Sequence, residues 1–370
     1  MPRSRPTSPS SSAPHLVING RFLTQPLTGV QRFALEITRH LAHLRPVEVL
    51  RPPLPGGTLP VDPATLTVVG RRSGQAWEQF ELPAALRRRG RPLLLNLGST
   101  GPLAYGRHIS THHDITYVRH PESFSRLFRT QYRAMIPPLL RGAQRVLTVS
   151  EFSRGELAAH FHLDPTRIEV VNNAVAPVFT EDGPLHRERE PYLLGVSSPN
   201  AHKNFRRLVE AFRRATRHRI RRLLIVGSQA PAFRSASLGN DDEVVMLGRV
   251  GDDELGRLYR GAAAFAFPSL YEGFGLPPLE AQACGTPVIA ARAASIPEVL
   301  GDSALYFDPL SVASIAEAIE AVDASPAVGR RLIEAGRQNV RRFSWERSAE
   351  TVSNVVDDVL AASARGTRAT

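Results

Sequence analysis

Cysteine and long apolar runs are almost absent from this 370-residue chain. Cys284 is the only cysteine, so a scaffold held together by disulfides is excluded. No apolar run approaches the roughly 20 residues that a membrane-spanning helix needs. Residues 1–14 are rich in serine and proline and lack the apolar core of a secretory signal. Hydrophobic residues still make up 42% of the chain, so we expect a cytoplasmic protein with two packed domains.

Lysine is the rarest charged residue. The chain has 45 arginines and one lysine, Lys203. Arginine therefore serves at nearly every solvated basic position, and a retained lysine indicates a site that needs a compact, flexible ammonium group. Chance retention is the alternative.

The formal net charge of +11 is unevenly distributed. Residues 1–180 hold 22 basic and 11 acidic side chains, whereas residues 181–370 hold 24 of each. A basic half is typical of contact with nucleic acid, anionic lipid head groups or a phosphorylated substrate, and a solvated surface in an arginine-rich chain is the alternative. The sequence contains no RNP-like aromatic motif and no zinc-ligand spacing, which disfavours nucleic acid.

Short apolar runs alternate with helical patterns in both halves of the chain. We expect strands at 15–19, 66–69, 93–97, 109–111, 145–149, 168–171, 192–196, 222–226, 244–247, 263–267 and 288–291. We expect helices at 29–44, 77–86, 128–140, 152–161, 205–216, 252–261, 311–322, 326–341 and 345–363. Pro137 and Pro138 should kink or end the third of these helices. The alternation predicts an α/β protein with two Rossmann-like, parallel-sheet domains facing a cleft.

A polar stretch at 180–190 is typical of a linker between the two domains. The predicted parts are a disordered leader at 1–14, an N-terminal domain at 15–180, a second domain at 181–345, and a C-terminal helix and tail at 346–370. The helix at the end is expected to cross back to the N-terminal domain.

The densest functional pattern runs from Phe267 to Ala290. An apolar strand leads into a loop with Gly273 and Gly275, and then into a helix that opens with two prolines, which suit a first helical turn. Glycines let a backbone approach a ligand closely, and the N–H groups at a helix start favour an anion such as a diphosphate.

Two glutamates accompany this loop. Glu272 lies just before Gly273, and Glu280 follows eight residues later inside the helix. Carboxylates accept hydrogen bonds from sugar hydroxyls, so one glutamate suits a ribose and the other a transferred hexose. Each feature alone is common in ordinary scaffold, but the whole run together is hard to explain as scaffold.

This pattern resembles the retaining glycosyltransferases of family 4, also called glycosyl transferases group 1, in which Glu272 and Glu280 match an E-x7-E pair. Bacterial polysaccharide mannosyl- and rhamnosyltransferases are the members it is most similar to. The resemblance spans about residues 15–360 and implies the GT-B architecture, with the acceptor on the N-terminal domain and the nucleotide sugar on the second. The other matching segments are Thr28–Phe33, His112–Asp114, Val149–Arg154, Val171–Val175, Gly195–Phe212 and Leu247–Leu255.

The resemblance implies transfer of a hexose from a nucleotide diphosphate sugar to an acceptor hydroxyl, with retention at the anomeric carbon. Lys203 and the loop amides would stabilise the leaving phosphate, Glu272 would hold the sugar, and His113 would contact the hexose. The implied catalytic residues are thus Glu272, His113 and Lys203. The implied donor-binding residues are Gly29, Lys203, Val250, Glu272, Gly273, Phe274, Gly275, Leu276 and Glu280.

Two positions depart from the family pattern. Many members have an arginine six residues before the lysine, where this chain has Ser197. The usual Asn-Gly after the last N-domain strand is Asn173-Ala174 here, and alanine tolerates left-handed backbone angles less readily than glycine. The chain contains no Asp-x-Asp pair, so we expect neither a metal nor a cofactor beyond the substrate, with GDP-mannose as the first choice of donor.

The acceptor is predicted from charge. Arg126, Arg129 and Arg133 lie at helical spacing beside apolar and aromatic residues, which favours a lipid-linked glycan and a peripheral position on the inner face of the cytoplasmic membrane. The alternatives are a soluble transferase that makes a disaccharide or glucan, and a catalytically silent sugar-nucleotide-binding protein.

Overall fold

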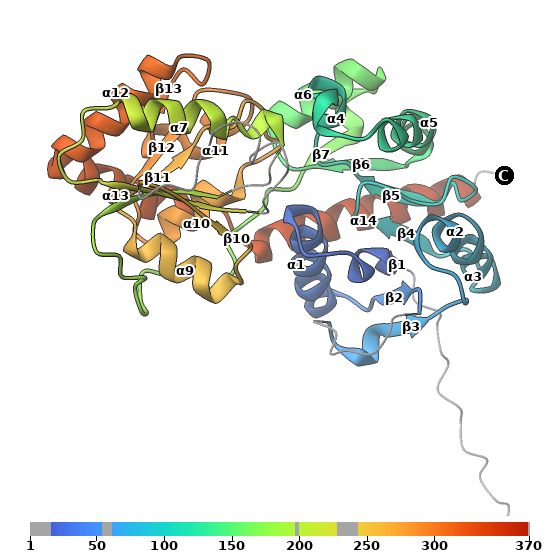
Figure 1. The fold of residues 1–370 in the computed structure, drawn as a ribbon. Coiled ribbons are helices and arrows are strands. Elements are labelled where there is room, and N and C mark those ends of the chain that lie inside the picture. The colour runs from blue at the N-terminus through green and yellow to red at the C-terminus, as the bar shows by residue number, and fades with distance from the viewer. Residues whose placement is uncertain (1–15, 54–60, 197–199, 228–242, 369–370) are drawn as a thin grey trace, which may run out of the picture. The chain divides into compact units, whose positions relative to one another are not determined.

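Two parallel β-sheets form the framework of the protein, as Figure 1 shows in the computed structural model. The structure describes residues 16–53, 61–196, 200–227 and 243–368. Strands pair in parallel in both sheets, with Ile18 opposite Val49 in the first and Ala266 opposite Ile289 in the second. This arrangement confirms the α/β class and the two parallel-sheet domains that strand–helix alternation predicts.

The first sheet has seven strands in the order β3-β2-β1-β4-β5-β6-β7. Its strands are β1 Leu16–Asn19, β2 Glu48–Arg51, β3 Leu66–Val68, β4 Leu93–Asn96, β5 His108–Thr111, β6 Arg145–Thr148 and β7 Ile168–Val170. The helices between these strands are α1 Gly29–Leu44, α2 Gly74–Ala76, α3 Leu82–Arg88, α4 Thr116–Arg119, α5 Arg126–Gly142 and α6 Glu151–Phe161. A single π-helical turn, Trp77–Glu81, joins α2 to α3.

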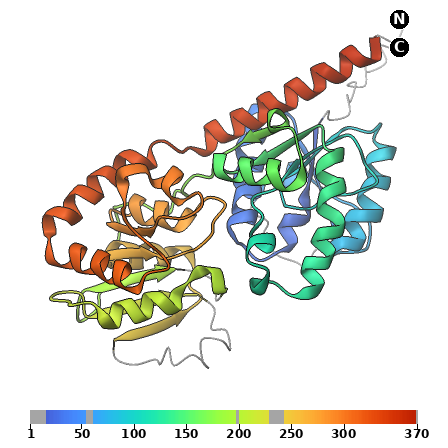
Figure 2. The ribbon, with the colours of Figure 1, turned by 90° about the horizontal axis from the view of Figure 1, so that it is seen from above.

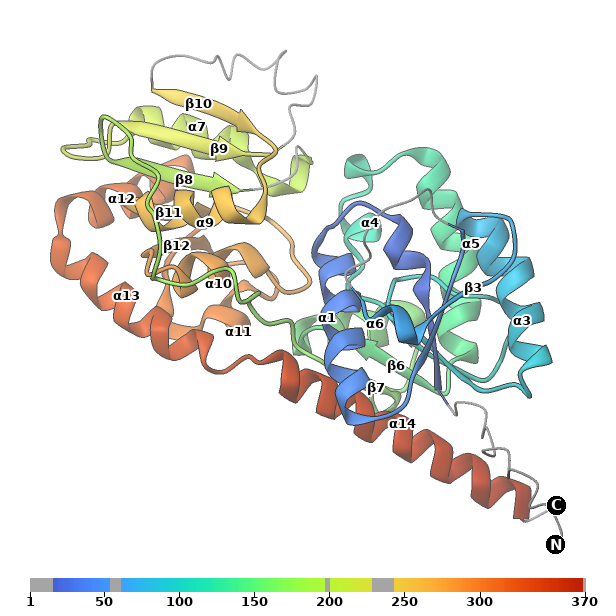
Figure 3. The same cartoon turned by 90° about the horizontal axis from the view of Figure 1, so that it is seen from below.

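The second sheet has six strands in the order β10-β9-β8-β11-β12-β13, and Figure 3 shows β10, β9 and β8 side by side. Its strands are β8 Tyr192–Val196, β9 Arg222–Val226, β10 Val244–Gly248, β11 Ala264–Phe267, β12 Val288–Ala291 and β13 Leu305–Phe307. Its helices are α7 Phe205–Arg214, α9 Asp252–Gly261, α10 Leu276–Ala283, α11 Ile296–Leu300, α12 Val312–Ala324 and α13 Pro326–Val340. The last helix of the chain is α14, Trp345–Arg368.

Contacts between Cα atoms divide the chain into two compact units. The first unit is Met1–His112, Met135–Val146 and Ala349–Thr370, and the second is His113–Ala134 and Leu147–Ser348. The domain boundaries expected at 180 and 345 stay predictions.

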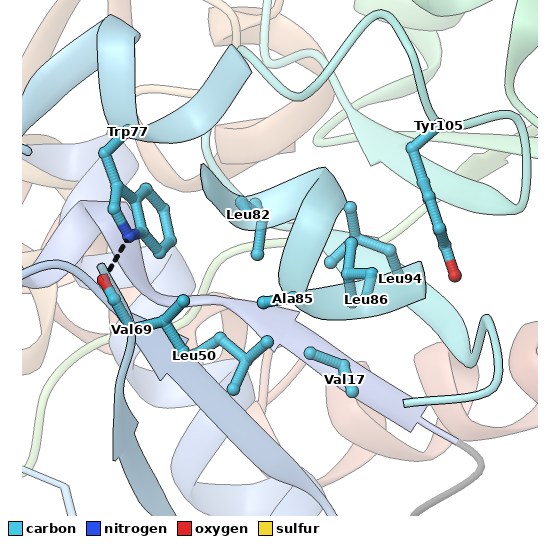
Figure 4. Close-up of a cluster of buried hydrophobic side chains, with 9 residues drawn as sticks. All are labelled: Val17, Leu50, Val69, Trp77, Leu82, Ala85, Leu86, Leu94 and Tyr105. Carbon is cyan, nitrogen blue, oxygen red and sulfur yellow. Dashed lines mark hydrogen bonds between the residues drawn. The ribbon is translucent and has the colours of Figure 1, made fainter. Parts of the chain in front are cut away.

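Apolar side chains from β1, β2, β4 and the helical stretch 74–88 form a core in the first unit (Figure 4). Trp77 lies at its edge, fully buried, and its indole N–H donates to the carbonyl of Val69 at 2.7 Å. That hydrogen bond lets the large ring be buried without leaving its polar atom unpaired, and each such side chain contributes about 1.5–3 kcal/mol of hydrophobic stabilisation. The nine residues of the cluster are Val17, Leu50, Val69, Trp77, Leu82, Ala85, Leu86, Leu94 and Tyr105.

The last helix, drawn in red in Figure 2, continues to Arg368. Its C-terminal part belongs to the first unit, where the Arg45 guanidinium donates to the Asp357 carboxylate at 2.9 Å and to the Ser353 carbonyl at 3.0 Å. None of the helices in the described part of the chain is long and apolar enough to cross a bilayer.

Of the two effects expected of Pro137 and Pro138, they do not end the helix, because α5 continues to Gly142, and a kink at the prolines stays a prediction. Proline removes one N–H and crowds the carbonyl four residues earlier, which weakens a helix interior. Ile136, Leu139 and Leu140 are at most 1% exposed, so burial of the apolar residues around the prolines holds the helix together.

Candidate active site

The glycine loop and its helix form at the carboxyl end of β11. Residues 268–275 connect β11 to α10, and Gly275 caps the helix with φ of 95°, in the left-handed region that favours glycine. Two prolines fill the first turn of α10, as expected. Proline has no N–H, so the donors at the start of α10 are the N–H groups of Gly275 and Leu276, which together with the helix dipole suit an anion.

Gly273 is a glycine because its backbone is packed against the segment that follows β5. A Cβ atom built there would lie 2.8 Å from Asp114 Cβ and 2.9 Å from the His113 carbonyl oxygen. Both distances are shorter than atoms can approach without a shift of the backbone. The loop position that the sequence assigns to close ligand approach is thus also a close contact within the protein.

Serine hydroxyls hold three successive carbonyl groups of this loop. Ser150 Oγ donates to the Gly273 carbonyl at 2.6 Å, and Ser153 Oγ lies 3.2 Å from the same oxygen. Ser295 Oγ donates to the Glu272 carbonyl at 2.9 Å and lies 3.2 Å from the Phe274 carbonyl. The three serines have relative exposures of 0%.

These contacts fix the direction of the loop N–H groups. In a trans peptide unit the N–H points opposite to the C=O of the same plane. The N–H groups of Gly273 and Gly275 therefore point away from Ser295, and that of Phe274 points away from Ser150. Pre-set N–H donors of this kind bind an anion without reorganisation.

Lys203 and Glu272 meet directly. Lys203 Nζ lies 2.6 Å from Glu272 Oε1, and the two side chains are 18% and 14% exposed. Lys203 ends a short 3-10 turn, Ala201–Lys203, and Asn204 follows it in a left-handed conformation. The Asn204 side-chain amide donates to the carbonyl of Pro268, in the loop after β11, and to that of Pro309, which follows β13.

Glu280 lies inside α10 and is 6% exposed. The hydroxyl of Tyr259, from α9, donates to Glu280 Oε2 at 3.2 Å. Burial and the neighbouring carboxylate raise the pKa of Tyr259 well above its usual range, so the hydroxyl stays protonated and keeps donating. The second carboxylate of the E-x7-E pair is therefore held in one orientation.

His113 follows β5 by two residues and is 6% exposed. Its carbonyl accepts a hydrogen bond from Thr148 Oγ1 at 3.3 Å and packs on Gly273, so the structure brings the His113 backbone to the loop. Asp114 accepts hydrogen bonds from the Thr116 amide at 2.8 Å and the Thr116 hydroxyl at 2.5 Å and starts α4.

The remaining predicted residues are more scattered. Val250 follows Gly248 in the turn before α9 and is half-buried. Phe274 is buried against the Phe343 ring, and Leu276 opens α10. Gly29 opens α1 in the first unit and is exposed. Ser197, the position where many family members have arginine, lies outside the described residues.

Glu298 is a site residue that the sequence reasoning missed. Its carboxylate accepts hydrogen bonds from the backbone N–H groups of Glu151 and Phe152, both at 2.8 Å, at the start of α6. It thereby caps the helix that presents Ser150 to the glycine loop. Ser150 itself accepts from the Ser153 amide, and the S-x-x-S spacing is a cap signal that the sequence contains.

Among the described residues, no group of three or more His, Cys, Asp or Glu side chains is placed to hold a metal ion. Cys284 is buried, as expected, and burial raises the pKa of its thiol to about 12. It therefore stays protonated and packs as a small apolar side chain.

The fold and the loop together define the class of protein. Two parallel-sheet α/β domains with a glycine loop, an E-x7-E pair and a lysine beside the first glutamate are the features of a GT-B glycosyltransferase. Two family models match the chain: Glycosyltransferase Family 4 at residues 27–179 and Glycosyl transferases group 1 at residues 180–339. The chain belongs to the glycosyltransferase family that combines these two domains.

Three known proteins illustrate the similarity. The O-antigen chain mannosyltransferase B of Escherichia coli is 29% identical over 371 residues, covering 87% of this chain and 93% of the relative. Sucrose-phosphate synthase from Thermosynechococcus elongatus superimposes with a TM-score of 0.74 at 20% identity, over 94% of this chain and 99% of the other. Anabaena HepE in complex with UDP-glucose gives a TM-score of 0.66 at 16% identity, over 93% and 99%.

Proposed function

We propose that this glycosyltransferase moves a mannose from a nucleotide diphosphate sugar to a glycan acceptor in cell-surface polysaccharide synthesis, with retention at the anomeric carbon. The observation that carries the proposal is the 2.6 Å contact between Lys203 and Glu272 beside the glycine loop. It supports the proposal because a cation that would stabilise phosphate and a carboxylate that would hold sugar hydroxyls lie next to each other. The relative that acts in O-antigen synthesis as a mannosyltransferase supports the choice of sugar and pathway.

Charge stabilisation is the main catalytic contribution in this proposal. When the bond to the sugar breaks, negative charge grows on the departing phosphate. The Lys203 ammonium and the loop N–H groups fixed by the serines would stabilise that charge, a type of contribution that is usually the largest in such sites. Glu272 would hold the hexose hydroxyls, and Glu280, oriented by Tyr259, would bind the ribose.

The donor is proposed to be GDP-mannose, bound without a metal ion or cofactor. A GT-B neighbour was solved with UDP-glucose bound, which supports a nucleotide sugar as the kind of donor. The base is proposed to lie near Val250, in the turn that precedes α9.

The acceptor is proposed to be lipid-linked. Leu127 on α5 is 79% exposed, and the exposed side chains of Arg126 and Arg133 accompany it. Behind them Phe128 and Tyr132 stack with ring centroids 4.0 Å apart, which stiffens this part of the helix. An apolar side chain flanked by arginines suits an anionic membrane surface, so we propose peripheral attachment at the inner face of the cytoplasmic membrane.

A soluble transferase that makes a disaccharide is the second candidate. It is favoured by the likeness to sucrose-phosphate synthase, which has the highest of the TM-scores given above. The two candidates differ in acceptor and in membrane binding, and they share the donor site.

Turnover of a donor panel tests the proposal. Purified protein is supplied with GDP-mannose, UDP-glucose and ADP-glucose together with a lipid-linked glycan fraction or with free sugars, and release of the nucleoside diphosphate is measured. We expect release from GDP-mannose with the lipid-linked acceptor, unaffected by a metal chelator, and proton NMR showing a product anomer of the same configuration as the donor. Glu272→Ala should abolish turnover, whereas turnover with a free sugar alone would favour the second candidate.

Flotation with anionic liposomes tests the proposed peripheral attachment to the membrane. We expect binding at low salt that falls at high salt, and weaker binding by Arg126→Ala/Arg133→Ala. Absence of binding at low salt would contradict peripheral attachment and leave the donor chemistry unaffected.

A further inference from the structure

Hydrogen bonds hold the turn that carries Lys203, both at the residue after the lysine and at the residue before it. Asn204, on its C-terminal side, donates to the Pro268 and Pro309 carbonyls at 3.1 Å and 2.7 Å. His202, on its other side, is 4% exposed and accepts a backbone hydrogen bond at its carbonyl from the Leu270 amide at 2.7 Å. Both ties lead to the loop that bears Glu272.

The imidazole of His202 makes a second set of contacts, with a different segment. Its Nδ1 lies 2.8 Å from Ser123 Oγ, in the short turn Pro121–Ser123. Its ring is parallel to that of Phe124 within 5°, at 6.5 Å between centroids, and the His120 ring lies 5.7 Å away. The side chain is thus enclosed by the residues just before α5.

His202 is uncharged in the folded protein, which suits a residue that positions Lys203 without repelling it. Burial, the Lys203 ammonium and His120 lower the pKa of His202 to about 3, so the ring is neutral across the physiological range. A neutral ring adds no charge next to Lys203, and Ser123 Oγ is the hydrogen-bond partner of its Nδ1. A cationic side chain at this position would repel the Lys203 ammonium.

We propose that His202 is a positioning residue: held by Ser123 and Phe124, it fixes the turn Ala201–Lys203 so that the Lys203 ammonium faces Glu272 and the phosphate of the donor. The inference rests on the proposed function, because the phosphate is the ligand that Lys203 is positioned for. His202 touches neither sugar nor phosphate and acts through Lys203.

The test measures the affinity of GDP and of GMP by calorimetric titration. Lys203→Ala should weaken GDP more than GMP, because GDP carries the additional phosphate. His202→Ala and Ser123→Ala should show the same pattern at about five- to tenfold for GDP, the size expected for one neutral hydrogen bond. His202→Asn, which keeps a polar atom near the place of Nδ1, should recover most of that loss. His218→Ala, which removes an exposed histidine of the same unit, should leave GDP affinity unchanged.

A double-mutant cycle separates positioning from general stability. If His202 acts through Lys203, then His202→Ala added to Lys203→Ala should lower GDP affinity no further. An additional five- to tenfold loss in the double variant, or equal losses for GDP and GMP, would overturn the proposal. Ser123 lies outside the buried turn, so Ser123→Ala can replace His202→Ala in the same cycle if the His202→Ala variant does not fold.

Failure of the inference and failure of the proposed function give different results. Wild-type protein that is folded and binds no nucleoside diphosphate would overturn both. Wild-type binding that Lys203→Ala weakens and that His202→Ala and Ser123→Ala leave intact would overturn the positioning role of His202 alone.

Discussion

Helix α1 opens with Gly29 and helix α10 is capped by Gly275, and the resemblance implies that both glycines bind the donor, yet the two helix starts are built differently. At α1, Thr28 makes no side-chain cap to the helix and Gly29 is exposed. At α10, buried serine hydroxyls hold the carbonyls of Glu272, Gly273 and Phe274. Similar glycine motifs therefore precede two different structures: the start of α1 is exposed, whereas buried serines hold the loop before α10.

This contrast shows where the preorganisation of the proposed site lies. A loop whose carbonyls are held keeps its N–H groups in place, so no ordering is required when charge develops. The start of α1 also offers N–H groups and the positive end of the helix dipole, but no side-chain cap from Thr28 holds it in place. We therefore expect the α10 loop to be far more sensitive to substitution than the α1 start.

The largest expected effect is that of Gly273→Ala compared with Gly29→Ala. The new Cβ at position 273 would meet Asp114 and the His113 carbonyl at less than 3 Å, so the loop must move, at a cost of about 1–3 kcal/mol in the free energy of unfolding. A displaced loop should lower kcat/KM by about a hundredfold. Gly29→Ala should keep or slightly raise stability, because alanine favours a helix.

Chemical denaturation and donor turnover of the two variants check this prediction. Equal losses of stability in the two variants would contradict the expectation that the loop before α10 is more sensitive to substitution than the start of α1.

The next effect is that of removing a serine hydroxyl from the loop. Ser295→Ala leaves the Glu272 carbonyl without its donor, and Ser150→Ala removes the shorter of the two contacts to the Gly273 carbonyl. A buried polar group left unpaired costs about 1–3 kcal/mol. We expect denaturant midpoints to fall in both variants, with a loss of GDP affinity that Ser73→Ala, on an exposed serine of the first unit, does not show. Unchanged affinity in both loop variants would mean that the serines do not orient the N–H groups.

A smaller effect should appear in the dependence of stability on pH. The pKa of His202 is about 3 in the folded protein and about 6.5 in an unfolded chain, so below pH 6.5 the unfolded state binds a proton that the folded state does not. The stability from this group is complete above pH 6.5 and is lost as the pH falls towards 3. Burial lowers the pKa of His202 most, Lys203 and His120 lower it further, and Asp114 and Glu122 oppose the shift.

Denaturation of wild type and His202→Asn between pH 4.5 and 8 measures this effect. The wild type should lose stability more steeply than the variant on the acid side. Parallel curves would show that His202 titrates normally.

The smallest effect concerns Ala294, next to Ser295. Its φ of 51° lies in the left-handed region, which costs a non-glycine residue about 1 kcal/mol. Ala294→Gly should therefore raise stability by up to about 1 kcal/mol, whereas Ala293→Gly, at a position without positive φ, should lower it by a similar amount. Thermal melting of the two variants compares them directly, and a loss in both would contradict strain at Ala294.

Much of the fold follows from hydrophobic periodicity. The helices at 29–44 and 252–261 begin and end where the pattern predicts, as do the strands at 192–196 and 222–226. The pattern misses β2 and β13, of four and three residues, although it finds β3 and β7, which have three residues each. Periodicity also cannot show that α5 continues past Pro137 and Pro138, because the burial of the neighbouring residues depends on tertiary packing.

Sequence motifs predict more of the candidate site than hydrophobic periodicity does. Lys203 and Glu272 were singled out separately, by rarity and by motif, and the structure brings them together. The contact of Ser150 with Gly273 joins residues 123 positions apart, and that of Glu298 with Glu151 joins residues 147 apart. Backbone-directed contacts over such separations leave no mark in local sequence, so these residues could be found only in the folded chain.

The most direct measurement is calorimetric titration of GDP, UDP and ADP into wild type and Lys203→Ala, with folding verified by circular dichroism. We expect micromolar binding of one nucleoside diphosphate, GDP first, and binding at least tenfold weaker in the variant, since a charge-assisted contact is lost. Equal affinity in the two proteins would contradict a donor site at Lys203. Absence of binding by all three nucleotides would contradict the nucleotide-sugar function itself.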